Sequence, residues 1–277
     1  MTIKCKICGR TPDEIPEYIN AAKEEDTHKM KHIVSFSGGK DSTAMLLMMI
    51  EKDMPIDEII FCDTGMEFSA MYRHINRVEK YIDREITRIK SKKTFEYFMF
   101  DYMKKKGKNK GKKGRGWPEP KIRWCTGALK SDISQQYLAN KKPYTLYIGI
   151  AADEQKRILK KKEKKDIFRR YPLIEWGITE RQALQYCYDR GFDWEGLYKL
   201  FDRVSCWCCP LQSLRALENL YLYFPDLWER LKEMDKRAFN QFRADYSVEQ
   251  LEQRFEKKLK NYSVSFFPIK RKEAEKK

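Results

Sequence analysis

The sequence predicts an α/β protein with a parallel sheet covered by helices on both faces, followed by a helical C-terminal subdomain. Three observations support this prediction. Short apolar runs rich in β-branched residues alternate with helical patterns, a glycine pair directly follows the first of these runs, and the pattern becomes helical and aromatic-rich after residue 179. Strands that alternate with helices favour right-handed crossovers, and these produce parallel strands.

The expected strands lie at residues 33–37, 59–62, 86–89 and 144–150. Helices are expected over residues 44–50 and 71–81, and over 214–224 and 227–242 in the C-terminal region. Each expected strand is followed by a polar or glycine-containing turn, which is typical of the loops at one edge of a parallel sheet.

Three segments are expected along the chain. Residues 1–30 are polar and carry the pair Cys5-x-x-Cys8, residues 31–178 form the α/β domain, and residues 179–277 form the helical subdomain. Residues 104–115 are mostly lysine, glycine and arginine with no apolar side chain, so we expect a mobile basic insert there.

The charge of the chain is strongly basic. Its 277 residues include 57 Lys+Arg against 41 Asp+Glu, a net charge of +16. Such a surplus attracts polyanions, so nucleic acid is one expected partner beside the nucleotide, while a solvated basic surface is the alternative.

The N-terminal residues lack the apolar stretch of a signal peptide, and we expect a cytoplasmic protein without membrane contact. In a reducing compartment, eight cysteines are better explained as metal ligands, reactive thiols or core residues than as disulfides.

The most informative segment is Ser37-Gly38-Gly39-Lys40-Asp41-Ser42-Thr43, between an expected strand and an expected helix. Glycines allow a tight turn and close backbone approach, and N–H groups at a helix N-terminus bind anions. The acidic Asp41 is unusual at an anion site unless it holds Mg²⁺. The segment therefore predicts a phosphate-binding loop, with a simple helix cap as the alternative.

The order Ser-Gly-Gly-x-Asp-Ser resembles the PP-loop of the N-type ATP pyrophosphatases, and it differs from the GxxxxGK[ST] loop of kinases and GTPases. This resemblance implies an adenine-nucleotide alpha-hydrolase-like, Rossmann-like fold. It also implies that the chain binds ATP, releases pyrophosphate and transfers AMP to an acceptor.

Four later segments resemble the PAPS reductase-like branch of that superfamily, and together with the loop they cover about residues 31–180. They are residues 61–68, residues 123–126 with Lys130, residues 149–157 and residues 171–176. Ala151 and Gln155 stand where the family has Arg and Ser, which weakens the expectation of sulfonucleotide recognition.

The resemblance assigns roles to individual residues. Asp41 would hold Mg²⁺, and Asp63, Thr64 and Gly65 would face the adenosine. The basic side chains expected to act on the phosphates are Lys40, Arg123, Lys130 and Arg157. The remaining expected nucleotide contacts are Ser37, Gly38, Gly39, Ser42, Thr43, Gly149, Asp153 and Glu154.

The segment Cys206-Trp207-Cys208-Cys209 is dense in thiols. Iron–sulfur sulfonucleotide reductases combine an early cysteine pair with a later Cys-x-x-Cys, and here only Cys125 remains of the early pair because Trp124 replaces its neighbour. Two hypotheses stay open: a [4Fe-4S] cluster on Cys125, Cys206, Cys209 and Cys208, or zinc held by Cys5 and Cys8 with Cys206 and Cys209.

The acceptor is less defined. Sulfonucleotide reductases of this family use a nucleophilic cysteine in a C-terminal tail, whereas no cysteine follows Cys209 in this sequence. Related sulfurtransferases of DNA phosphorothioation instead activate nucleic acid. We therefore expect adenylation of an acceptor for sulfur transfer, with nucleic acid modification as one form. The alternatives are a genuine sulfonucleotide reductase and a non-catalytic nucleotide- or nucleic-acid-binding protein of a mobile element or defence system.

Overall fold

A computed structural model describes residues 30–107, 109–158 and 166–266. One sheet of five parallel strands has the order β3-β2-β1-β4-β5. The strands are β1 (Lys31–Phe36), β2 (Glu58–Asp63), β3 (Ile86–Lys90), β4 (Tyr144–Ile148) and β5 (Ile167–Arg170). The four expected strands are confirmed. The edge strand β5 was missed because its four residues contain only two apolar ones next to a basic run.

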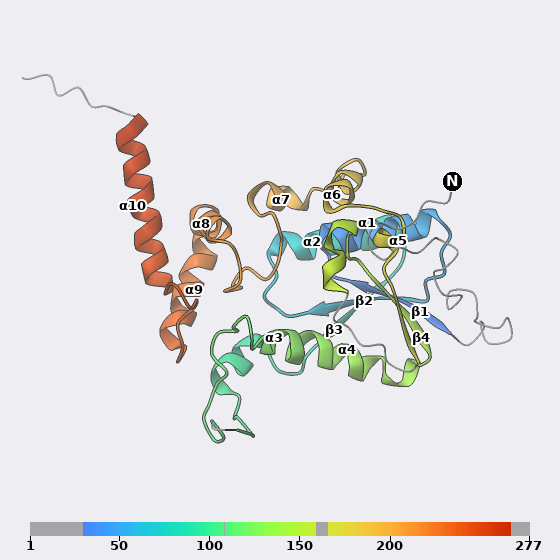
Figure 1. Cartoon of the computed structure of the whole chain (residues 1–277), viewed down its shortest axis with the longest axis horizontal. Helices are drawn as coiled ribbons and strands as arrows, with labels where there is room; N and C mark the ends of the chain where they lie inside the picture. Colours follow the sequence, from blue (N-terminus) through green and yellow to red (C-terminus); the bar gives the residue numbers. More distant parts are fainter. Residues whose placement is uncertain (1–29, 108, 159–165, 267–277) are drawn as a thin grey trace, which may run out of the picture.

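Helices cover both faces of the sheet, as predicted (Figure 1). One face carries α1 (Lys40–Glu51) and α2 (Ser69–Ile82), and α5 (Pro172–Glu175) and α6 (Glu180–Tyr188) pack on α1. The other face carries α3 (Trp124–Thr126) and α4 (Asp132–Tyr137), joined by a π-helical turn.

Alternation along the strands explains these two layers. On β1, Val34 faces the larger hydrophobic core beneath α1 and α2, whereas Ile33 faces a smaller core with Leu138 from the end of α4. Successive side chains of a strand point to opposite faces, so two adjacent buried positions require cover on both sides.

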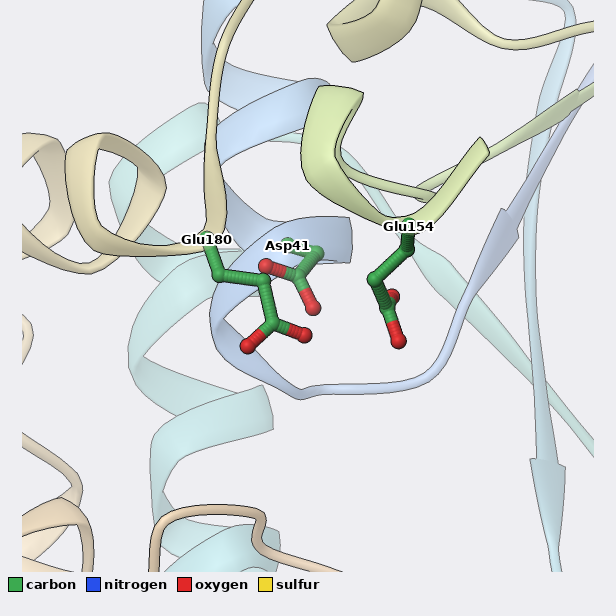
Figure 2. A group of neighbouring side chains, drawn as sticks. All are labelled: Asp41, Glu154 and Glu180. Atoms are coloured by element: carbon green, nitrogen blue, oxygen red, sulfur yellow. The ribbon is translucent and has the colours of Figure 1, made fainter. Parts of the chain in front are cut away.

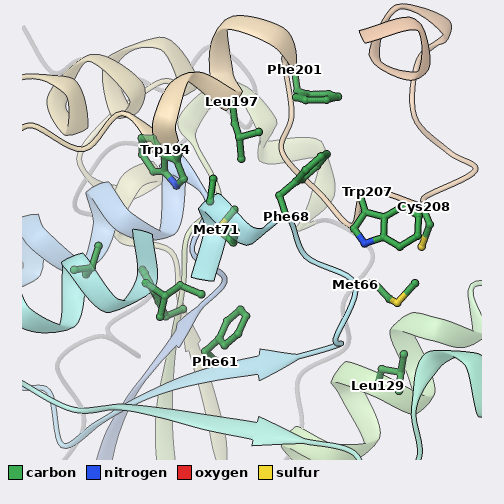
Figure 3. Close-up of a cluster of buried hydrophobic side chains, with 14 of the residues drawn as sticks. Phe61, Met66, Phe68, Met71, Leu129, Trp194, Leu197, Phe201, Trp207 and Cys208 are labelled. Carbon is green, nitrogen blue, oxygen red and sulfur yellow. The ribbon is translucent and has the colours of Figure 1, made fainter. Parts of the chain in front are cut away.

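The region after residue 179 is helical, and in addition to α6 it contains α7 (Leu197–Leu200), α8 (Leu214–Tyr223), α9 (Pro225–Arg237) and α10 (Val248–Phe266). It shares the larger core with the sheet: the ring of Phe68 lies 5.1 Å from the ring of Phe201 (Figure 3) and 5.1 Å from the ring of Phe224. The helix expected over residues 227–242 ends at Arg237, and residues 238–247 form a connection instead. Phe242 in this connection is buried, so it packs in the core although its backbone is not helical.

The basic insert has a defined path as a short hairpin, which we call the basic hairpin (residues 103–107 and 109–113). Met103 and Lys113 form an antiparallel bridge, and the N–H of Lys104 donates to the carbonyl of Lys112 over 3.0 Å. At the base of the hairpin, the Arg115 guanidinium lies 4.1 Å from the centre of the Tyr102 ring. The insert thus extends from an aromatic base, with its lysines toward solvent.

Candidate active site

The loop between β1 and α1 is closed by its own side chains. Gly38 has a φ of +76°, and a Cβ at this position would lie 2.6 Å from Sδ of Met71. The Ser42 hydroxyl accepts the N–H of Ser37 over 3.1 Å and donates to the Gly39 carbonyl over 3.0 Å. The loop is thus held by its own hydrogen bonds, and it leaves the N-terminus of α1 at the carboxyl edge of the sheet, where anions are favoured.

The end of β4 touches this loop at Gly149. A Cβ on Gly149 would lie 2.8 Å from both N and Cα of Ser42, so any larger residue would push the two loops apart. Strands β1 and β4 are neighbours in the sheet. The strand that follows β1 is β2 and the strand that follows β4 is β5, and these lie on opposite sides of the β1–β4 pair. Ligands of open parallel sheets bind in the crevice at such a point.

Residues from the helical region enclose the loop from outside. The Trp194 indole N–H donates to the Gly38 carbonyl over 2.7 Å, and the Tyr198 hydroxyl accepts the backbone N–H of Lys40 over 2.8 Å. Burial raises the pKa of Tyr198, which keeps this hydroxyl neutral. Sequence reasoning missed both aromatic residues, because helical spacing in an aromatic-rich region also fits simple core packing.

The loop is also supported from behind. The Thr43 hydroxyl lies 3.0 Å from Nε2 of His74, and the backbone N–H of Thr43 donates to the Gly39 carbonyl over 2.9 Å. The His74 ring stacks on Trp194 at 4.3 Å, and burial lowers the pKa of His74 to about 3. Both the hydroxyl and the backbone N–H of Thr43 thus have partners inside the protein.

Three carboxylates meet beside the loop (Figure 2). One oxygen each of Asp41, Glu154 and Glu180 lie within 4.8 Å of one another, and Oδ1 of Asp41 is buried without a hydrogen-bond partner among the described residues. Carboxylate oxygens are the protein ligands that Mg²⁺ prefers, so this group fits a cation that also contacts phosphate oxygens. Glu180 was not predicted; it begins α6, far along the chain from Asp41.

Lys40 lies between two of these carboxylates. Its Nζ is 3.3 Å from Oδ2 of Asp41 and 3.3 Å from Oε2 of Glu180. Burial raises the pKa of Asp41 to about 6, the charges of Glu180 and Glu154 add to this rise, and Lys40 opposes it. The site thus concentrates negative charge that one ammonium group only partly offsets.

Two further predicted residues hold the carboxylates in place. Asp153 accepts the backbone N–H of Glu180 over 3.1 Å, and Arg157 forms an ion pair with Glu154. In this structure Asp153 therefore orients Glu180, and the guanidinium of Arg157 is engaged with Glu154 beside the loop.

The Asp63-Thr64-Gly65 turn follows β2. Asp63 accepts the backbone N–H of Gly65 over 2.8 Å and the Tyr72 hydroxyl over 2.7 Å. Gly65 has a φ of +74°, and a Cβ there would meet no atom within 4 Å. The turn is therefore fixed by Asp63 and opens onto free space at Gly65.

A buried carboxylate connects this turn to the cysteines. Glu67 accepts the Thr64 hydroxyl over 3.1 Å and the Cys206 thiol over 3.6 Å, and Nζ of Lys130 lies 3.8 Å away. Burial lowers the pKa of Lys130, but Glu67 and nearby thiols more than offset this, so its pKa is raised. Glu67, which sequence reasoning left without a role, thus stands between the predicted residues Thr64, Lys130 and Cys206.

The described cysteines of the predicted metal site are neighbours. Burial raises the pKa of Cys206, Cys208 and Cys209, and the charges of Cys206, Cys209 and Cys125 raise that of Cys208 further. Close, buried thiols of this kind ionise when a metal binds them, because the metal compensates the thiolate charge. Arg123 lies near Cys209, where its charge opposes the rise of that thiol's pKa.

The two metal hypotheses differ in the spacing they require. A zinc ion draws its ligands to about 2.3 Å, which places ligand sulfurs about 4 Å apart. A four-iron cluster is larger than one ion and suits more widely spaced thiolates. Cys5 and Cys8, which the zinc hypothesis needs, lie outside the described residues.

The chain is similar to known proteins in sequence and in structure. The profile of the phosphoadenosine phosphosulfate reductase domain matches residues 31–212. An uncharacterized protein of Methanocaldococcus jannaschii is 23% identical over 214 residues, which cover 72% of this chain and 40% of that protein. Another from the same organism is 27% identical over 209 residues, covering 73% of this chain and 47% of that protein. The chain thus spans less than half the length of these relatives.

Two solved structures are similar. The phosphoadenylyl-sulfate reductase of Candida auris, in its phosphate complex, has a TM-score of 0.47 at 19% identity, covering 63% of this chain and 81% of that one. The U34-tRNA thiolase NcsA from Methanococcus maripaludis, with its [4Fe-4S] cluster, has a TM-score of 0.41 at 16% identity, covering 94% and 89%. Among the described helices of the present chain, none is both long and apolar enough to span a membrane.

Proposed function

Because the chain belongs to the phosphoadenosine phosphosulfate reductase domain family, we propose that it is an enzyme that binds ATP, or a related adenine nucleotide, and cleaves it at the α-phosphate. The observation that carries this proposal is the carboxylate group of Asp41, Glu154 and Glu180 beside the N-terminus of α1. An anion-binding helix end next to clustered carboxylates fits a phosphate chain together with its Mg²⁺ ion.

Each part of the site has a place in this reaction. An acceptor attacks the α-phosphorus, the bond to the bridging oxygen breaks, and pyrophosphate leaves. The N-terminus of α1 holds the phosphates, and Asp41, Glu154 and Glu180 would hold Mg²⁺, which neutralises charge on the leaving pyrophosphate. Lys40 holds Asp41 and Glu180 in position through its two ion pairs.

The adenosine is proposed to lie against the turn after β2, where Gly65 opens onto free space. The hydrogen bonds of Asp63 to Gly65 and Tyr72 make this turn rigid before any nucleotide arrives. A rigid turn loses little conformational freedom when the nucleotide binds.

Cys125, Cys206, Cys208 and Cys209 are proposed to hold a [4Fe-4S] cluster, which would supply sulfur or redox chemistry beside the adenylated acceptor. The support is that Cys125, Cys206 and Cys209 lie near enough to the buried Cys208 thiol for their charges to raise its pKa, with Lys130 and Arg123 nearby to balance negative charge. Adenylation for sulfur transfer is therefore the favoured reaction class.

The experiment measures pyrophosphate release by the anaerobically purified chain with ATP and Mg²⁺, with and without total RNA or DNA as acceptor. We expect release that requires Mg²⁺ and is lost in Asp41→Asn, whereas the exposed control Asp132→Asn retains it. Sulfite released from phosphoadenylyl sulfate would instead support the reductase alternative. Nucleotide binding without any release would support the non-catalytic alternative.

A further inference from the structure

A cavity of about 640 Å³ lies outside the phosphate loop, between segments that are far apart in the sequence. Its walls come from residues 118–120, 210–212 and 240–245. Pro210 directly follows Cys209, so one wall begins at the turn that carries the thiols. A volume of this size accommodates a small organic group. The proposed nucleotide chemistry leaves this cavity unused.

The wall nearest the cysteines is held by hydrogen bonds. The Gln212 amide donates to the carbonyls of Cys206 and Trp207, both over 3.0 Å. The Arg243 guanidinium donates to the carbonyls of Pro210 over 3.0 Å and of Gln212 over 2.5 Å. The cavity is therefore preformed and tied to the cysteine turn rather than to a loose surface loop.

The chemistry of the walls is mixed in a specific way. Pro120 and Leu211 supply exposed apolar surface, Gln241 supplies an amide, and the cavity is also lined by charged side chains, namely Glu119, Arg243 and Asp245. A nucleobase has the matching character, because its faces stack on apolar surface and its edges donate and accept hydrogen bonds.

The basic hairpin stands next to this cavity. Nζ of Lys104 lies 4.2 Å from the centre of the Phe239 ring, and a Cβ on Gly116 would lie 2.0 Å from Oδ1 of Asn240 in the cavity wall. Phe239 is 63% exposed. Figure 1 shows residues 102–107 and 109–115 extending from the side of the sheet that carries α3, near the end of α9.

The exposed lysines of the hairpin form no ion pair within the part of the chain that the structure describes. They are Lys105, Lys106, Lys110, Lys112 and Lys113. Uncompensated ammonium groups beside an exposed aromatic ring are the combination that binds single strands, where lysines contact phosphates and aromatic rings stack on bases.

We propose that the basic hairpin, Phe239 and the cavity together form a binding site for single-stranded nucleic acid, with one unpaired base in the cavity beside Cys209. The lysines hold the backbone, Phe239 stacks on one base, and the Gln241 amide oxygen contacts the edge of the next. This inference rests on the proposed function in one respect only: it names the acceptor of the adenylation.

A single strand fits better than a duplex, because a paired base is stacked inside its helix and cannot enter a cavity without being extruded. An acidic peptide would satisfy the lysines but would use neither Phe239 nor the apolar surface of the cavity. The position of the cavity next to the cysteine turn would bring the bound base close to the site proposed for sulfur chemistry.

Binding is tested by fluorescence anisotropy of labelled single-stranded RNA and DNA 12-mers with the full chain and without ATP. The double variant Lys110→Gln/Lys112→Gln should reduce the salt dependence of log K by about 1.4, because each lost phosphate contact on a single strand contributes about 0.7. The matched control Lys80→Gln/Lys257→Gln, on α2 and α10, should bind as the wild type does.

Two substitutions at exposed positions separate stacking from charge. Phe239→Ala should weaken binding about tenfold, within the range for one stacked base, whereas the equally exposed Tyr223→Ala on α8 should not. Ala244→Trp should fill the cavity and abolish the fluorescence change of a 2-aminopurine base placed in the 12-mer.

Because ATP is absent, failure of the nucleotide chemistry leaves this test intact. Asp41→Asn should still bind the 12-mer at wild-type affinity even though it releases no pyrophosphate. The proposal is overturned if the folded wild type does not bind, or if the hairpin and control variants bind equally. It is also overturned if poly-glutamate competes as well as the oligonucleotide, since the surface would then recognise acidic peptides.

Discussion

The phosphate-loop region (residues 37–43 with Gly149, Glu154 and Glu180) and the cysteine region (residues 62–67, 125–130 and 206–209) lie at the ends of neighbouring strands but are stabilised differently. In the first, hydroxyls and carbonyls are paired at 2.7–3.1 Å. In the second, Asp63 fixes its turn with bonds of 2.7 and 2.8 Å, whereas the Cys206 thiol contacts Thr64 and Glu67 over 3.6 Å, and burial disfavours its ionised form.

This difference indicates how each region reaches its working state. The phosphate loop is held by its own hydrogen bonds, and Lys40 and Arg157 offset part of the charge of Asp41, Glu154 and Glu180. In the cysteine region, burial raises the pKa of the Cys206, Cys208 and Cys209 thiols, and no comparable set of cations is paired with them among the described residues. A metal group would supply positive charge there, so we expect this region to gain more order and stability from its ligand than the loop does.

The comparison is tested most strongly at Asp41. Asp41→Asn should lower turnover about 10²–10³-fold, the loss typical of one electrostatic contact to the transition state. The same change should stabilise the metal-free protein by about 1 kcal/mol at pH 7, because it removes a buried charge. Pyrophosphate assays and urea unfolding in EDTA measure both effects, and lower stability together with normal turnover would refute the assigned role.

Gly149 tests how tightly the phosphate-loop region is packed. Gly149→Ala places a methyl group 2.8 Å from the Ser42 backbone and should cost about 2–3 kcal/mol in the free energy of unfolding. In the cysteine region, Gly127→Ala meets nothing within 4 Å, has a helical φ of −61°, and should leave stability equal or raised by about 0.5 kcal/mol. Equal losses in the two variants would contradict the contrast.

The cysteine region is tested by metal content. Iron and acid-labile sulfide measured after anaerobic purification should fall at least about tenfold in Cys206→Ser, since loss of a ligand weakens the whole site. Cys187→Ser, at a buried thiol beside Lys40 in the phosphate-loop region, should retain wild-type iron. An iron-free wild type, or equal iron in both variants, would show that these thiols do not hold a cluster.

A smaller effect is expected from His74, behind the phosphate loop. Its pKa is near 6.5 in the unfolded chain and about 3 in the folded protein, so the unfolded state binds more protons between these values. The contribution of neutral His74 to the free energy of unfolding is therefore fully present above pH 6.5. It is lost as the pH falls, by about 1 kcal/mol between pH 7 and 5.5. Urea unfolding should show this loss to be smaller in His74→Gln, which keeps a polar group near Thr43. An identical pH dependence in both proteins would refute the buried, neutral state of His74.

Local patterns made much of the fold predictable. The strands at residues 33–37 and 59–62 are apolar runs. The phosphate loop is a contiguous segment, and its two glycines predict a tight turn. Glu180, Trp194 and Tyr198 could not be found in this way. They reach the loop from more than one hundred residues away, and only tertiary packing brings them to Lys40 and Gly38.

The same limit applied to the cysteine region. The Cys206–Cys209 spacing predicted a metal site. Glu67 could not be predicted as a neighbour of Cys206, because only tertiary packing brings the turn after β2 to the cysteine turn. The end of α9 at Arg237 could not be predicted either, because the spacing of Phe239 and Phe242 is also compatible with a continued helix. Packing of Trp117 against Phe242 decides that the chain turns there.

The central claim is that the phosphate-loop region binds an adenine nucleotide with Mg²⁺. Isothermal titration calorimetry with α,β-methylene ATP, whose α–β linkage cannot be cleaved, tests it directly. We predict saturable binding that weakens at least about tenfold in EDTA, since the three carboxylates repel the phosphates when no cation is present. Absence of binding to the folded wild type, or binding that is unchanged by EDTA, would contradict the claim.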